Sequence, residues 1–129
     1  MTYETLLAEY DEVLDITERP MKNEGLYADG CIWINEKLST KRKACILAEE
    51  IGHYYTSTGN ILDMKKMGNI KQELRARRWA YQKVVPVDRI IEAASKGYVE
   101  IWDMAEYLDV DEEFLRDCLM YYGILDISL

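Results

Sequence analysis

The only histidine of this 129-residue chain ends the stretch Glu49-Glu50-Ile51-Gly52-His53. Residues four apart share one face of an α-helix, so Glu49 and His53 can point at the same object. Glu50 lies about 100° round the helix, beside them. This is the spacing of metal-binding helices of the HExxH type, with glutamate in place of the first histidine. The pattern predicts a metal site in which His53 is a ligand and Glu50 is the base that activates bound water.

A metal site of this type also needs a carboxylate from a later helix. The segment from Asn69 to Val84 reads as that helix, and Glu73 is its only acidic residue. Glu73 can therefore complete a ligand set with Glu49 and His53. It can equally form an intrahelical ion pair with Arg77, four residues further on.

Glutamate at position 49 does not by itself abolish metal binding, because carboxylate oxygen binds Zn²⁺ at a distance close to that of imidazole nitrogen. A Glu/His/Glu set is harder than a two-histidine set and favours Mn²⁺ or Fe²⁺ more strongly. Its extra negative charge makes bound water a weaker acid. The expected cofactor is Zn²⁺, with Mn²⁺, Fe²⁺ or no bound metal as alternatives. The competing interpretation of His53 is a hydrogen-bonded core histidine, and that of Glu49 and Glu50 a solvated helix face.

Apolar spacing predicts the elements before this motif. Residues 2–14 read as an amphipathic helix capped by Thr2, with an apolar stripe at Tyr3, Leu6, Leu7, Tyr10, Val13 and Leu14. Residues 25–35 read as a β-hairpin, because Asp29-Gly30 between two apolar runs suits a type I′ turn. Two strands alone are marginally stable, so the hairpin must pack on helices or further strands.

The motif helix is expected to begin at Ser39 or Thr40 and to end near Ser57. Its predicted apolar stripe consists of Ala44, Leu47, Ala48, Ile51 and Tyr55. Residues 61–68 are expected to form a loop or a single helical turn. The next helix, from Asn69 as cap to Val84, has two candidate inward registers: Ile70, Leu74, Arg77 and Tyr81, or Glu73, Ala76 and Ala80.

Three helices are predicted after Pro86, over residues 86–95, 100–108 and 111–122. The joint at residues 108–111 resembles a helix-turn-helix. The supposed recognition helix, however, carries Arg116 alone against Asp111, Glu112, Glu113 and Asp117. Such a surface repels DNA, so this segment is expected to be a packing unit or a protein-docking face.

The net charge of −8 is unevenly distributed. Residues 39–85 hold 10 basic and 4 acidic residues. Residues 1–38 hold 3 basic and 9 acidic residues, and residues 86–129 hold 3 basic and 11 acidic residues. We expect the basic centre, including Arg75, Arg77 and Arg78, to form ion pairs with the acidic flanks rather than to bind nucleic acid. No apolar run is long enough to cross a membrane, and three widely spaced cysteines indicate no disulfide framework. These features favour the cytoplasm.

The segment from Leu47 to His53, followed by residues 72–80, resembles the ImmA/IrrE family of metallopeptidases. The resemblance is to the short type carried by phages and mobile elements, and it extends to the hairpin at Gly25–Gly30. By position, the general base of the family falls on Glu50 and its metal ligands on Glu49, His53 and Glu73. Glu49 is the departure, because the family has histidine there.

This resemblance implies an α+β, mainly helical fold: a gluzincin-like domain over residues 1–85 and a helical segment over residues 86–129. It implies a metal-dependent endopeptidase that acts on a regulatory protein, such as a helix-turn-helix repressor of a mobile element. The alternative is a degenerate peptidase fold that sequesters a repressor without cleaving it. Tyr54 or Tyr55 is a candidate donor to a tetrahedral oxyanion. The sequence does not indicate the oligomeric state.

Overall fold

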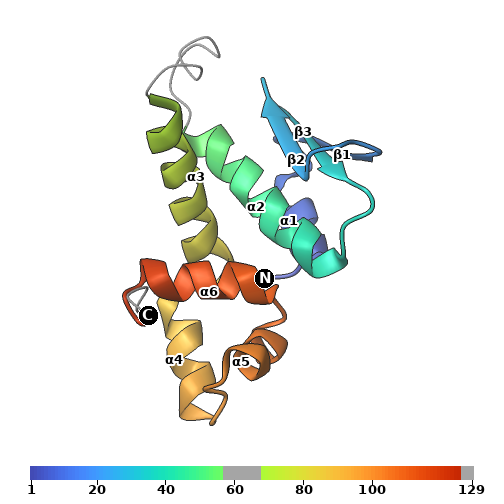
Figure 1. The fold of residues 1–129 in the computed structure, drawn as a ribbon. Helices are drawn as coiled ribbons and strands as arrows, with labels where there is room; N and C mark the ends of the chain where they lie inside the picture. The colour runs from blue at the N-terminus through green and yellow to red at the C-terminus, as the bar shows by residue number, and fades with distance from the viewer. Residues whose placement is uncertain (57–67, 126–129) are drawn as a thin grey trace.

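The computed structural model describes residues 1–56 and 68–125 (Figure 1). Its elements are α1 (Tyr3–Tyr10), β1 (Asp15–Arg19), β2 (Gly25–Ala28), β3 (Cys31–Asn35), α2 (Thr40–Thr56), α3 (Gly68–Val84), α4 (Val87–Ser95), α5 (Ile101–Leu108) and α6 (Glu112–Tyr121). The expected α+β, mainly helical class is confirmed. The loop or turn predicted over residues 61–68 lies outside the described residues, except for Gly68, which begins α3.

The predicted hairpin is present and belongs to a three-stranded sheet of order β1-β3-β2. Asp29 and Gly30 both have positive φ, at 48° and 82°, as a type I′ turn requires. Along β3 the side chains alternate, so that Ile32 and Ile34 are buried. β1 pairs with β3 in parallel and was not predicted, because Asp15–Arg19 contains a single aliphatic residue, Ile16, among polar ones.

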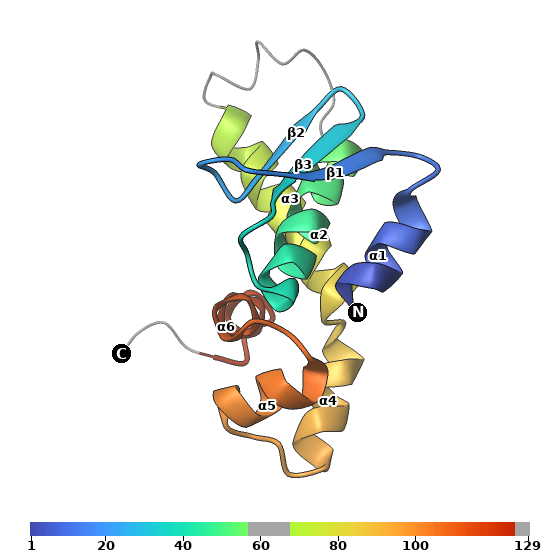
Figure 2. The same ribbon diagram turned by 90° about the vertical axis from the view of Figure 1, so that its right-hand side faces the viewer.

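Helix α2 is the middle layer of the fold. The sheet packs on one side of it and α3 on the other, so the three lie one behind another in Figure 2. Ser39 caps the helix, since its Oγ accepts a hydrogen bond from Arg42 N at 3.1 Å. Its buried residues are Ala44, Cys45, Ile46, Leu47, Ala48, Ile51, Gly52 and His53. The prediction that Tyr55 belongs to the apolar stripe is wrong, because this residue is 52% exposed.

Helices α2 and α3 approach so closely that only glycine fits at position 52. A Cβ atom there would overlap the carbonyl oxygen of Ala76 and lie 2.9 Å from its Cα. Of the two registers predicted for α3, the structure has the one that buries Ala76 and Ala80. In the other register, Ile70 is 72% exposed and Leu74 is 42% exposed. Small side chains occupy the α2–α3 contact because they allow the two helix backbones to approach each other closely.

The N-terminal helix is shorter than predicted. Thr2 caps α1 as expected, accepting a hydrogen bond from Thr5 N at 3.2 Å, but the helix ends at Tyr10. Leu14 is buried in the core beyond the helix, whereas Val13 is exposed. The apolar periodicity of residues 10–14 therefore reflects a turn that leads into β1 rather than another helical turn.

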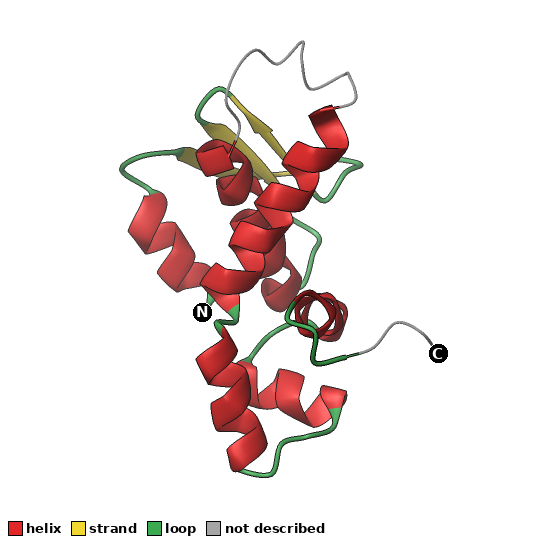
Figure 3. Cartoon of the chain, turned by 90° about the vertical axis from the view of Figure 1, so that its left-hand side faces the viewer, coloured by secondary structure: helices red, strands yellow, loops and turns green. Residues whose placement is uncertain are grey.

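Helices α4, α5 and α6 form a group at one end of the molecule (Figure 3). All three helices are where the sequence predicted them. Asp111 caps α6 by accepting from Phe114 N at 3.1 Å, and the two predicted closing glycines, Gly97 and Gly123, have positive φ. Among the described residues, no helix is both long and apolar enough to span a membrane.

The acidic flanks pair with four of the basic residues of the centre, Lys41, Arg42, Lys43 and Lys83, as the charge distribution predicted. Arg42 contacts Glu24 at 2.7 Å and Asp111 at 3.3 Å. Similar pairs join Lys43 to Glu18, Lys83 to Glu9 and Lys41 to Glu106. The prediction is wrong for the run on α3. Arg77 pairs within its own helix, and within residues 1–56 and 68–125 Arg75 and Arg78 form no ion pair.

Candidate functional site

Glu50, His53 and Glu73 line one cavity of about 270 Å³ beside the edge strand β2. Glu50 and His53 come from α2 and Glu73 from α3, so the α2–α3 contact brings the motif and the later carboxylate together. The opposite wall is Gly25, Leu26 and Tyr27 of β2. We refer to this cavity as the cleft.

Gly25 at the start of β2 makes room for the Glu50 side chain. A Cβ atom at position 25 would lie 3.1 Å from Glu50 Oε2 and would also overlap Ile46 Cγ2. The missing side chain allows the strand to approach α2 closely. The Glu50 carboxyl is thereby held between the helix and the strand edge, where an extended polypeptide added to β2 would pass.

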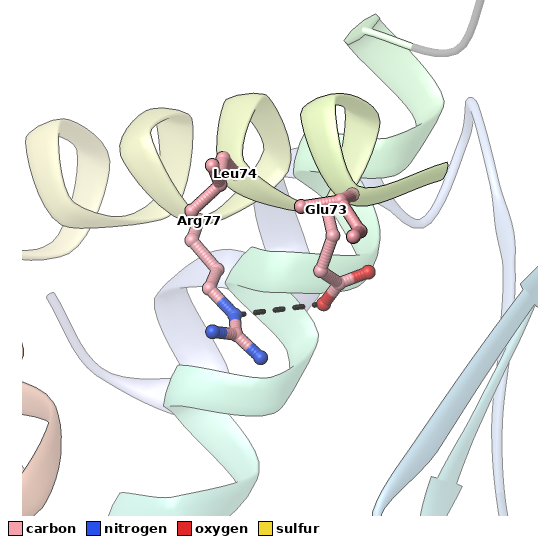
Figure 4. A pocket seen from close by; sticks show the side chains of 4 residues that line it. Glu73, Leu74 and Arg77 are labelled. Atoms are coloured by element: carbon pink, nitrogen blue, oxygen red, sulfur yellow. Dashed lines mark ion pairs between the residues drawn. The ribbon is translucent and has the colours of Figure 1, made fainter. Parts of the chain in front are cut away.

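Glu73 links His53 to Arg77. Its Oε2 lies 2.9 Å from His53 Nε2, and its Oε1 lies 3.5 Å from Arg77 Nε. The second of these pairs is the dashed line in Figure 4, where Glu73 and Arg77 project from the same side of α3. The predicted intrahelical pair with Arg77 is therefore present, and the same carboxylate also contacts His53. The other ring nitrogen of His53, Nδ1, is buried with no hydrogen-bond partner in the described part of the chain.

Burial dominates the electrostatics of the two adjacent glutamates. It raises the pKa of Glu49 to about 7, against the lowering effect of Arg77 and Arg42. It raises the pKa of Glu50 to about 7 as well, against the lowering effect of His53. A carboxyl with a pKa near neutrality is suited to accept and return a proton.

The His53–Glu73 pair behaves differently. Burial opposes the charged imidazole, but the hydrogen bond to Glu73 and the charges of Glu50 and Glu73 outweigh it and raise the pKa of His53. The same hydrogen bond lowers the pKa of Glu73. In this arrangement the two residues stabilise each other as imidazolium and carboxylate.

Two of the three predicted metal ligands converge and the third does not. Ligand atoms on one tetrahedral Zn²⁺ lie about 3.3 Å apart, so His53 Nε2 and Glu73 Oε2, at 2.9 Å, are close to that separation. Glu49 does not line the cleft. No three His, Cys, Asp or Glu side chains form a metal-binding cluster within residues 1–56 and 68–125. Two of the predicted donors, on His53 and Glu73, therefore lie at a separation that one metal ion can bridge, and the third, on Glu49, is outside the lining of the cleft.

The structure adds one aromatic residue to the cleft and excludes two. Tyr27 lines it, whereas the sequence-based candidates Tyr54 and Tyr55 do not. Tyr54 packs behind Tyr27, with their ring centroids 6.3 Å apart. The hairpin signal places Tyr27 on β2, but nothing in the sequence shows that this strand forms a wall of the cleft.

A comparison with known families agrees with this geometry. The family model described as the IrrE N-terminal-like domain, peptidase family M78, matches residues 3–120. No curated protein sequence matches the chain. The matched region contains the cleft and the six helices of the described residues, with only Tyr121, the last residue of α6, outside it. The chain belongs to the IrrE N-terminal-like, or ImmA/IrrE, family of metallopeptidases.

Proposed function

We propose that this protein hydrolyses a peptide bond in a protein partner bound at the cleft. The observation that carries the proposal is the convergence of Glu50, His53 and Glu73 in one cavity beside β2, which is an edge strand of the sheet in the described residues. An extended substrate can add to β2 by main-chain hydrogen bonds, which brings its backbone alongside Glu50. Family membership supports hydrolysis as the reaction.

The residues take distinct roles in this proposal. His53 and Glu73 hold a metal, with Glu49 as third ligand, and Zn²⁺ is the expected ion with Mn²⁺ or Fe²⁺ as alternatives. The metal, when bound, supplies a Lewis acid at the substrate carbonyl. Glu50 accepts a proton from the attacking water and returns it to the leaving amine. Gly25 leaves the space in which that carboxyl moves.

The partner we propose is a cytoplasmic helix-turn-helix repressor of a phage or mobile element. This extends the family resemblance and the expectation that the substrate is a protein. We also propose that residues 1–85 carry the chemistry and that residues 86–129 form a packed helical segment. The acidic residues of α6 argue against direct DNA binding by this segment.

Glu50→Gln tests hydrolysis. We expect the wild type, loaded with Zn²⁺ or Mn²⁺, to cleave members of a proteome-derived peptide library, as detected by mass spectrometry. Glu50→Gln should cleave at least about 100-fold more slowly, because amide nitrogen and oxygen cannot accept the proton. Glu113→Gln, which alters an exposed acid on α6, is the matched control. Equal cleavage by wild type and Glu50→Gln would refute the assigned role.

A second function is favoured by the position of Glu49. Since Glu49 lies outside the cleft and His53 already pairs with Glu73, the protein can also act by binding a repressor without cleaving it. Sequestration predicts that Glu50→Gln releases repressed transcription as well as the wild type does. Hydrolysis predicts that release is lost in this variant. The comparison separates the two functions even when the scissile bond is unknown.

A further inference from the structure

Two further cavities adjoin the cleft along α3. The first, of about 330 Å³, shares Glu73 with the cleft and is lined by Ile70, Glu73, Leu74 and Arg77. The second, of about 400 Å³, shares Leu74 and Arg77 with the first and reaches α6; it is lined by Leu74, Arg77, Arg78, Tyr81, Asp117, Met120 and Tyr121. Because each cavity shares wall residues with the next, the three follow one another along α3. We call the two cavities beyond the cleft the α3 groove.

The α3 groove is long enough to hold several residues of a bound chain. Glu73 and Tyr81 are eight residues apart on α3, which at 1.5 Å per residue is about 12 Å. An extended polypeptide covers this distance with about four residues. A substrate that passes Glu50 in the cleft can therefore continue along α3 toward α6.

The floor of the groove is apolar and well supported. Leu74 is 42% exposed at its centre. At the far end the rings of Tyr81 and Tyr121 lie 5.5 Å apart, and Tyr81 rests on Phe114 at 5.4 Å. The hydroxyl of Tyr121 accepts a hydrogen bond from Gln82 at 2.8 Å, which ties α6 to α3. A surface held from both helices can receive an apolar side chain without rearranging.

Within the described part of the chain, one cation of the groove has no ion pair. Arg77 is engaged by Glu73, whereas Arg78 is exposed and forms no ion pair among residues 1–56 and 68–125. The opposite wall carries Asp117, so a carboxylate from the partner is favoured on the α3 side and disfavoured on the α6 side. The third exposed arginine of α3, Arg75, does not line the groove.

We infer that the α3 groove selects the substrate: the partner is a polypeptide whose chain, just beyond the segment in the cleft, places an apolar side chain on Leu74 and an acidic side chain on Arg78. This inference rests on the proposed function, because it concerns a chain that enters the cleft. It assigns Leu74 and Arg78 as residues that determine specificity and take no part in the bond-breaking step.

The test is a binding selection with full-length Glu50→Gln protein, which keeps peptides intact. A randomised mRNA-displayed library of twelve-residue peptides is selected on this protein, and on the same protein carrying Arg78→Glu or Arg75→Glu. In the selections on Glu50→Gln alone and on Glu50→Gln with Arg75→Glu, we expect peptides enriched in Asp or Glu next to an apolar residue. In the selection on Glu50→Gln with Arg78→Glu, we expect Lys or Arg at that acidic position. For one selected acidic peptide, Arg78→Glu should weaken the Kd at least about tenfold, and Arg75→Glu by less than about twofold.

The same charge preference with Arg78→Glu as without it would overturn the inference, and so would the absence of any acidic enrichment. Selected peptides are then offered to the metal-loaded wild type. Acidic enrichment without cleavage would leave the groove assigned and refute hydrolysis. Cleavage without acidic enrichment would support hydrolysis and refute the role assigned to the α3 groove. The weakening by Arg78→Glu should shrink at high ionic strength, because the pair is exposed to solvent.

Discussion

His53 Nε2 lies 2.9 Å from Glu73 Oε2, which joins the only imidazole of the chain to the only acid of α3. The contact spans two helices and exists because α2 and α3 touch at Gly52 and Ala76. It raises the pKa of His53 against the effect of burial and lowers the pKa of Glu73, and both side chains line the cleft. A metal that uses both residues as ligands must break this ion pair, so metal binding is expected to depend on pH.

Metal binding should release a proton and depend on His53. Because Glu73 raises the pKa of His53, the imidazole must lose its proton before it can bind Zn²⁺ or Mn²⁺. Apparent affinity should therefore rise up to about tenfold per pH unit below that pKa. Calorimetric titration of chelator-treated protein in two buffers of different ionisation enthalpy measures both effects. His53→Ala should abolish the heat, and identical heats from wild type and His53→Ala would eliminate the metal site.

Stability of the metal-free protein should fall as the pH rises from about 5 to about 8. The pKa values of Glu49 and Glu50 are about 7 in the folded protein and near 4.5 when unfolded, so the folded state favours their protonated forms. Their contribution is complete below about pH 4.5 and is lost as the pH passes 7, and the raised pKa of His53 acts in the same direction. Glu49 alone should account for about 2–3 kcal/mol of the change.

Urea unfolding at several pH values checks this, with Glu49→Gln as the informative variant. That variant removes one titrating group and also a charge that adds to the effect of burial in raising the pKa of Glu50. Its free energy of unfolding should therefore vary less between pH 5 and pH 8 than that of the wild type. A wild-type stability that increases over this range would show that both carboxyls are ionised in the folded protein at pH 5.

Gly52→Ala should destabilise the protein by about 2–4 kcal/mol. In an exposed helix the same change stabilises by roughly 1 kcal/mol, so the sign of the effect reports the contact with Ala76. Gly30→Ala is the control. No atom lies within 4 Å of a Cβ there, and the cost should be about 1 kcal/mol, from the positive φ alone. Thermal or urea unfolding measures both variants, and a stabilised Gly52→Ala would show that the helices do not touch at this point.

Tyr27→Phe should lower kcat about 10- to 100-fold with little change in KM, if the Tyr27 hydroxyl donates to the oxyanion that forms in the cleft. Tyr54→Phe is the matched control, since Tyr54 packs on Tyr27 but does not line the cleft. Steady-state kinetics on a cleaved peptide distinguishes them. Equal losses in the two variants would indicate an effect of ring packing and not of the hydroxyl.

Much of the local structure was predictable from short-range patterns. The Asp29-Gly30 turn, the Ser39 and Asp111 caps and the closing glycines Gly97 and Gly123 depend on interactions within a few residues, and the structure has them all. The strand β1 was missed, because a strand with mostly polar side chains is stabilised by its partner β3 and not by its own pattern. Tyr55 was also mispredicted, because its helical spacing matches the buried stripe of α2 but does not reveal that the residue is 52% exposed.

The sequence by itself determined the spacing of Glu49, Glu50 and His53, since helical periodicity follows from residue order alone. It also singled out Glu73 as the only acid of its helix. Only the tertiary structure decided which of these residues meet. The close approach at Gly52 brings Glu73 to His53, and β2 encloses Glu50 and adds Tyr27. Glu49, although it belongs to the motif by spacing, lies outside the cleft because side-chain direction depends on what packs against each face of α2.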